Sequence, residues 1–268
     1  MIRRVRTVVD SVPTLVLVLV VVGVVVGLVL LSVWAVRRLL PETRDGFDAE
    51  VSSQMLGVVA SLFGLLLAFV VVIEFQAFTS AGATVSAEAN GLAAIVRDSH
   101  AFDEPGGTNV RAAIGGYVRA VTEQEWPRMR HGDESAAAWR GIDQMFATMQ
   151  QYKPVTTAQV AFYDDAVRHL NAVLQARRDR LDTSSGDSLP LLIAALVLVG
   201  AGVILGYATL VGSRSAAFHA IGAGAIAVVV GFTLVVLITL QFPFSGGLAV
   251  DSHPFRQGVL AQFFVQPK

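Results

Sequence analysis

Cysteine is absent from this 268-residue sequence, and lysine occurs only twice beside 18 arginines. Without thiols the chain can form no disulfide framework, no zinc–thiolate centre and no cysteine nucleophile. Charged residues are also scarce, at 15% of the sequence against about 25% in an ordinary soluble domain. Because the net charge is only −1, no overall field would attract nucleic acid. The arginine bias, with abundant Ala, Val and Gly, indicates a bacterial protein.

Sequence motifs for catalysis are missing as well. The chain has no nucleophile elbow, Walker loop, HExxH zinc motif or paired-glycine nucleotide fingerprint. Asp165 and His169 are four residues apart and would share a helix face, but a metal site needs three or more ligands, so we expect a solvated pair. The sequence therefore predicts a protein that is not an enzyme, with no catalytic residue, no cofactor and no metal.

The sequence does contain four long apolar blocks, at residues 12–36, 55–75, 189–211 and 220–242. About 20 apolar residues in a helix suffice to cross the hydrocarbon core of a bilayer, so each block predicts a transmembrane helix. Ser188 and Pro190 are suited to the start of the third helix, and Pro243 would end the fourth.

The first block has a second interpretation, a cleaved signal peptide, because Arg3, Arg4 and Arg6 precede it. The block is longer than the apolar region of a signal peptide, and it ends in Trp34 and a pair of arginines rather than in small residues. We therefore favour an uncleaved span, with Trp34 in the interfacial aromatic belt.

Most of the charge falls between the second and third blocks, in residues 76–188. This insert shows no strand alternation, and Pro- and Gly-containing breaks divide it into four expected helical segments: 76–100, 109–126, 134–152 and 156–181. The chain is thus predicted to be an all-α membrane protein with four transmembrane helices and an all-helical cytosolic insert between the second and third spans. The expected parts are a tail, first span and linker (1–54), the second span (55–75), the insert (76–188), a hairpin of the third and fourth spans (189–242) and a C-terminal tail (243–268).

Orientation is predicted from the arginines near the span ends. A cytoplasmic N-terminus would place seven of them inside: Arg3, Arg4, Arg6, Arg177, Arg178, Arg180 and Arg256. Four would lie outside: Arg37, Arg38, Arg44 and Arg214. This asymmetry predicts a multi-pass protein of the bacterial plasma membrane with both termini and the insert in the cytoplasm. The run from Arg177 to Arg180 would then meet anionic lipid head groups.

A 3.5-residue period begins in the second block and continues into the insert. It defines a heptad stripe: Gly57, Ser61, Gly64, Ala68, Val71, Phe75, Phe78, Gly82, Val85, Ala89, Leu92 and Val96. Such a period is typical of left-handed helix packing, and the small residues of its first part would allow close helix contact. The stripe predicts one unbroken helix past Phe78, packed either on this chain or on another subunit, with Val70 on the lipid side.

Glu74 is the only acid inside a predicted span. An ionisable residue in a membrane helix is a functional candidate by default, here at a pore mouth or paired with an arginine. The alternative is that Glu74 marks the membrane interface, where a charge costs little.

Two short motifs carry a family resemblance. One is the stretch from Tyr117 through Glu125, Trp126 and Pro127 to Met129, and the other is Pro243-Phe244-Ser245-Gly246 after the last span. With two spans, a helical insert and a closing hairpin, they resemble the bestrophin-like domain family of bacteria and plants over residues 55–265. A charged pair often precedes the second motif in that family, whereas Gln241-Phe242 stands here. We interpret the motif residues as mainly structural, with Trp126 as a packing anchor.

The resemblance implies a function. Bestrophins are pentameric anion channels whose second span lines the pore with an apolar, aromatic neck. Ile73, Glu74, Phe75 and Phe78 would occupy that position here, and hydrophobic rings can gate a pore by dewetting. We therefore expect a homo-oligomeric ion channel that passes inorganic ions; the acid leaves the sign of the ion open. The alternative is a non-conducting membrane scaffold or sensor whose cytosolic domain binds a protein or lipid.

Overall fold

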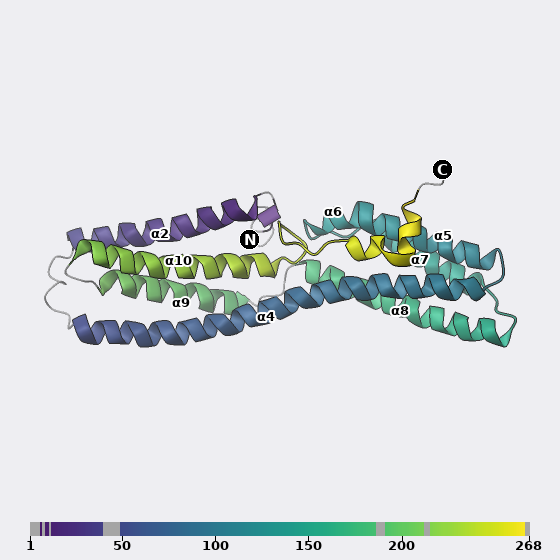
Figure 1. Ribbon diagram of the computed structural model, residues 1–268, viewed down its shortest axis with the longest axis horizontal. Helices are drawn as coiled ribbons and strands as arrows, with labels where there is room; N and C mark the ends of the chain where they lie inside the picture. Colours follow the sequence, from purple (N-terminus) through teal and green to yellow (C-terminus); the bar gives the residue numbers. More distant parts are fainter. Residues whose placement is uncertain are drawn as a thin grey trace. The chain divides into compact units, whose positions relative to one another are not determined.

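The computed structural model describes Arg6 and residues 9–10, 12–39, 49–185, 191–211 and 215–265. All regular structure in these residues is helical, which confirms the all-α prediction for the described chain. The helices form two compact units, coloured along the sequence in Figure 1. The apolar unit comprises Ser11–Ala77 and Ser188–Gln241, and the polar unit comprises Met1–Asp10, Phe78–Asp187 and Phe242–Lys268.

The apolar unit contains the four predicted spans. They are α2 (Thr14–Leu39), the first part of α4 (Ala49–Asp98), α9 (Leu191–Leu210) and α10 (Ala216–Gln241). In the described chain, each of these four helices is long and apolar enough to cross a bilayer. The predicted start of the third span at Ser188 and Pro190 lies outside the described residues.

Small residues let the helices of the apolar unit pack closely. On α4, Phe63, Leu67 and Val70 are buried against α9 and α10. A Cβ at Gly200 of α9 would collide with the Phe63 ring, so the missing side chain makes room for that ring. Val70 is 6% exposed, so its predicted place on the lipid side is wrong.

The polar unit has its own core, built around the second part of α4. That half of the helix is buried through Val85, Leu92 and Val96 against α5 (Gly106–Ala120), α7 (Ala136–Gln151) and α8 (Thr157–Ser185). Because α4 is a single helix from Ala49 to Asp98, the predicted continuation of the second span past Phe78 is confirmed.

The predicted helix stop at Pro127 is wrong. Helix α5 passes directly into a π-helical turn, η2 (Val121–Glu125), and then into α6 (Trp126–Met129). Pro127 lies in the first turn of α6, where a missing N–H costs little because such groups have no partner within the helix. The sequence contains no signal for this π turn. The π turn interrupts the α-helix and so places the proline at the start of a new one.

The C-terminal residues belong to the polar unit rather than forming a free tail. After α10 the chain makes a compact turn in which the Val250 N–H donates to the Pro243 carbonyl at 2.7 Å. Gly246 has a φ of +82°, a conformation that favours glycine. The short helices η3 (His253–Arg256) and η4 (Gly258–Phe263) follow, and they bury Phe255 and Leu260 in the core of the polar unit.

Candidate pore region and buried charge network

The four predicted pore residues do not share a face of α4. Ile73 and Phe75 are 56% and 57% exposed, and Phe78 is half-buried. Glu74 is only 2% exposed, and one of its carboxylate oxygens has no hydrogen-bond partner in the described chain. Glu74 is therefore buried within its own chain, whereas the Phe75 side chain is exposed.

The heptad stripe changes its surroundings along α4. In the polar unit Val85, Ala89 and Leu92 are buried in the core of the same chain. In the apolar unit Gly57, Ser61, Gly64 and Ala68 are exposed. No described atom from beyond α4's own neighbouring turns lies within 4 Å of a Cβ built at Gly57, Gly64 or Gly82. Packing within the described chain thus accounts for Val71 and for the stripe from Val85 onward, and leaves the part from Gly57 to Ala68 uncovered.

A histidine joins three helices of the apolar unit. The Arg37 Nε–H of α2 donates to His219 Nδ1 at 3.3 Å, which assigns that ring nitrogen as an acceptor. The other nitrogen, Nε2, then carries the proton and donates to the Ala208 carbonyl of α9 at 3.1 Å. His219 is 7% exposed, and sequence reasoning gave it no role.

The polar unit contains a fully buried network of two acids, two arginines and a tyrosine. Glu88 of α4 receives the Arg180 Nε–H at 2.7 Å and the Arg180 Nη2–H at 3.0 Å, and the Tyr117 hydroxyl donates to it at 2.5 Å. Glu125 of η2 receives Arg180 at 2.9 Å and Arg177 at 2.5 and 3.2 Å. All four charged side chains are 0% exposed, so the two positive and two negative charges compensate each other away from water.

Aromatic rings surround the two guanidinium groups. Arg177 lies 4.0 Å from the centroid of Trp139, and Arg180 lies 5.2 Å from that of Trp126. Arg177 Nη1 is buried with no hydrogen-bond partner in the described chain, and contact with the Trp139 ring partly offsets that loss.

Burial and the neighbouring arginines act in opposite directions on the pKa of Glu125, whereas burial and the Glu88 charge act together on the pKa of Tyr117. Burial alone would raise the pKa of Glu125, but the hydrogen bond from Arg177 and the charge of Arg180 hold that pKa below its usual value. Burial and the neighbouring Glu88 carboxylate raise the pKa of Tyr117 well above its usual value. At neutral pH the network therefore holds an ionised Glu125 and a protonated tyrosine.

This network corrects the predicted role of the arginine run. Arg177 and Arg180 are core residues and cannot meet lipid head groups, whereas Arg178 between them is exposed. Their spacing of three residues places both on one helix face, and that spacing was the only sequence signal for a shared partner. Their acid partners are 52 to 92 residues away in the sequence, so spacing alone could not identify them.

The two family-like motifs meet in the polar unit. The Trp126 ring packs edge-on against Phe244 with centroids 6.0 Å apart, and against Phe255 at 5.8 Å. The Ser245 hydroxyl donates to the Arg130 carbonyl at 2.8 Å. Tyr117 and Glu125 of the first motif are members of the charge network, and Pro243, the first residue of the second motif, is buried. The motif residues thus hold residues 243–246 against the turn that follows α6, within the polar unit.

Comparison with known families identifies the chain. Residues 23–255 match the Bestrophin-like domain, from within α2 to η3. The protein belongs to the Bestrophin-like domain family. No curated protein and no solved structure matches it in the same comparisons. Membership and the four apolar helices together make it a bestrophin-like membrane protein.

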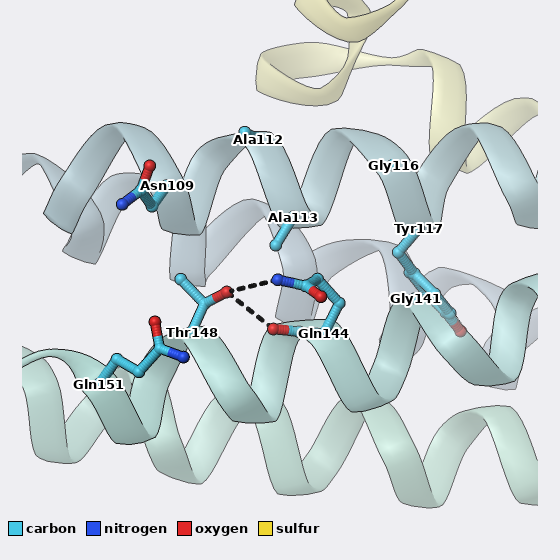
Figure 2. Close-up of a pocket in the computed structure, with 9 residues that line it drawn as sticks. All are labelled: Asn109, Ala112, Ala113, Gly116, Tyr117, Gly141, Gln144, Thr148 and Gln151. Carbon is cyan, nitrogen blue, oxygen red and sulfur yellow. Dashed lines mark hydrogen bonds between the residues drawn. The ribbon is translucent and has the colours of Figure 1, made fainter. Parts of the chain in front are cut away.

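The bestrophin-like polar unit also has a surface pocket between α5 and α7, with a volume of about 500 Å³ (Figure 2). Its polar side chains are Asn109, Gln144, Thr148 and Gln151, and Gln144 and Thr148 hydrogen-bond to each other. None of the lining residues is charged, so the pocket offers no feature that selects an ionic ligand. No group of three metal-ligating residues occurs in the described chain, and Asp165 pairs with Arg168.

Proposed function

We propose that this bestrophin-like protein assembles into a homo-oligomeric ion channel in which α4 lines a central pore. The observation that carries the proposal is the uncovered first part of the heptad stripe. Small residues at Gly57, Ser61, Gly64 and Ala68 form a face of α4 that has no partner among the described residues. In a bilayer, close contact between such faces is a main source of helix association.

The neck of the proposed pore lies at Phe75 and Phe78. Phe75 is 57% exposed and belongs to the same stripe as the small residues, so assembly along the stripe would bring its copies toward a common axis. Apolar rings at a constriction repel water and raise the barrier to ions. Glu74 is buried within its own chain, and its proposed role is to set the charge behind the neck rather than to face the ions directly.

We further propose that both chain ends and the polar unit are cytoplasmic. Contacts within the polar unit support a shared side: the Arg6 guanidinium donates to the Ser184 carbonyl, and the Gly246 N–H donates to Asp10. Arg6 precedes the first span, Ser184 precedes the third and Gly246 follows the fourth, so these contacts support a position of all three segments on one face of the membrane. The arginine asymmetry then favours the cytoplasmic face.

Oligomeric state and conductance together test the channel. We expect a multimer in nanodiscs and single-channel currents in planar bilayers, with larger currents for Phe75→Ala because a ring leaves the constriction. A monomer would exclude the axial pore. A stable multimer that never conducts, with or without Phe75→Ala, would favour the scaffold or sensor function instead.

Two glycine variants test where the subunits meet. A Cβ at Gly64 of α4 or at Gly202 of α9 would touch no described atom outside its own helix turns. If the stripe is the subunit contact, Gly64→Leu should reduce the multimer while Gly202→Leu leaves it intact. Equal effects of the two substitutions on assembly would contradict the proposed interface.

A further inference from the structure

Two exposed arginines lie at the end of α6 and in the turn that joins it to α7. Arg128 is in the last turn of α6, and Arg130 follows directly after that helix. Both side chains are exposed, and no described residue accepts a hydrogen bond or ion pair from either guanidinium group. They differ in this from Arg177 and Arg180, which are closed within the charge network.

The turn is tied to chain segments that flank two spans. The Arg130 carbonyl accepts the Ser245 hydroxyl at 2.8 Å, and Ser245 lies four residues after the end of α10. Gly132 lies directly against the Arg6 guanidinium, eight residues before the start of α2. Because an extended chain covers at most about 3.5 Å per residue, Ser245 can be no more than about 14 Å from the end of α10. The turn is therefore held near the membrane surface by covalent connection.

The acids beside the two arginines are already engaged. Glu134 accepts the Trp139 indole N–H at 2.9 Å. Asp133 has its backbone N–H bonded to the Arg128 carbonyl, and it takes part in a further interaction of its own. Both acids are exposed as well, but neither is paired with Arg128 or Arg130 in the described chain, so the two guanidinium groups can each bind a further anion.

We propose that Arg128 and Arg130 bind the phosphate of anionic phospholipid head groups in the leaflet next to the polar unit. A guanidinium group forms two parallel hydrogen bonds with phosphate oxygens and is weakly hydrated, which suits it to the head-group layer. That layer is about 5–8 Å thick on each side of the hydrocarbon core, a depth that an extended arginine side chain can span. The lipid thereby fixes the turn between α6 and α7, whose Arg130 carbonyl accepts the Ser245 hydroxyl. This interaction does not depend on whether the protein conducts ions.

Lipid binding to the full-length protein tests the proposal. The probe is fluorescent phosphatidylglycerol titrated into protein in a neutral detergent, with phosphatidylcholine as the zwitterionic comparison, whose choline cation compensates its phosphate. The double variant Arg128→Gln/Arg130→Gln should weaken phosphatidylglycerol binding about five- to thirty-fold, since each basic residue near an anionic surface contributes on the order of a few-fold to tenfold. Binding of phosphatidylcholine should stay unchanged.

The matched control removes two arginines far from the span ends. Arg97 is near the end of α4, and Arg168 is on an exposed face of α8. Arg97→Gln/Arg168→Gln should bind phosphatidylglycerol like the native protein, and its thermal stability serves to check folding in both double variants. Equal loss in the two double variants would overturn the proposal, because it would indicate a general effect of net charge.

Inorganic phosphate distinguishes the two sources of the ligand chemistry. Tens of millimolar phosphate should displace little phosphatidylglycerol, because the free ion lacks the acyl chains that hold the lipid at the surface. Complete displacement would show a site for free phosphate and not for lipid. If the native protein binds phosphatidylglycerol no more tightly than phosphatidylcholine, the proposal is also refuted. That result would favour an acidic protein as the partner of the two arginines.

Discussion

Replacing Arg180 with methionine tests the buried charge network most directly. The guanidinium makes three contacts with carboxylates, at 2.7, 2.9 and 3.0 Å, and is 0% exposed. Without it, the Tyr117 hydroxyl is the hydrogen-bond donor that Glu88 keeps in the described chain, while Glu125 keeps Arg177 and the Ser135 N–H. A stranded buried carboxylate is the larger cost, because removing one member of a buried ion pair destabilises a protein by about 3–5 kcal/mol.

Thermal unfolding in detergent measures this cost. For a unit of this size, each kcal/mol lowers the melting temperature by roughly 2–4 °C, so Arg180→Met should lower it by roughly 6–20 °C. Tryptophan fluorescence reports on the network itself, since Trp126 and Trp139 lie against its two guanidinium groups. The matched control is Arg178→Met, two residues away and exposed, which should change stability by less than about 0.5 kcal/mol.

A second substitution identifies the cause. Adding Glu88→Gln to Arg180→Met removes the stranded negative charge and keeps an oxygen to accept the Tyr117 hydroxyl. The double variant should therefore be more stable than Arg180→Met alone, which is the non-additivity expected for two groups in contact. If Arg180→Met costs no more than Arg178→Met, or if Glu88→Gln brings no recovery, the reasoning about a closed and compensated network is refuted.

Three further predictions concern acid sensitivity and helix packing. The pKa of Glu125 is held below its usual 4.5, so the ionised carboxylate stabilises the folded protein at neutral pH, and this stability is lost as the pH falls below about 4.5. In a profile of melting temperature against pH, Glu125→Gln should therefore flatten the fall on the acid side. Gly200→Leu should destabilise the apolar unit by about 1–3 kcal/mol or more, since the new side chain would collide with Phe63. The control Gly202→Leu should leave the stability of a single chain almost unchanged. Similar losses in the two variants would contradict the packing of Phe63 on Gly200. His219→Leu removes both hydrogen bonds of the ring and should lower the free energy of unfolding by about 1–3 kcal/mol in the same assay. An unchanged free energy of unfolding would show that the histidine does not link the helices.

Local composition was enough to predict the four spans and the long helices of the insert, although not the π turn at Val121–Glu125 or the short C-terminal helices. The four spans follow from apolar block length, and the long α4 follows from a helical period with no proline between residues 51 and 104. The motif around Trp126 and the motif at Pro243 indicated the family before any contact was known, and the match over residues 23–255 confirms it. These features are readable because each depends on residues close together in the sequence.

Only the tertiary structure decided which charges are buried and which faces are free. Arg177, Arg178 and Arg180 look alike in the sequence, yet two are closed in the core and one is exposed, because Glu88 and Glu125 reach that helix from distant segments. Val70 and Gly64 lie in the same apolar block, yet the first packs on α9 and α10 while the second meets no described atom outside its own helix turns. Apolar periodicity fixes that a helix crosses the membrane, but its rotation is set by packing against neighbouring helices, which the sequence does not specify position by position.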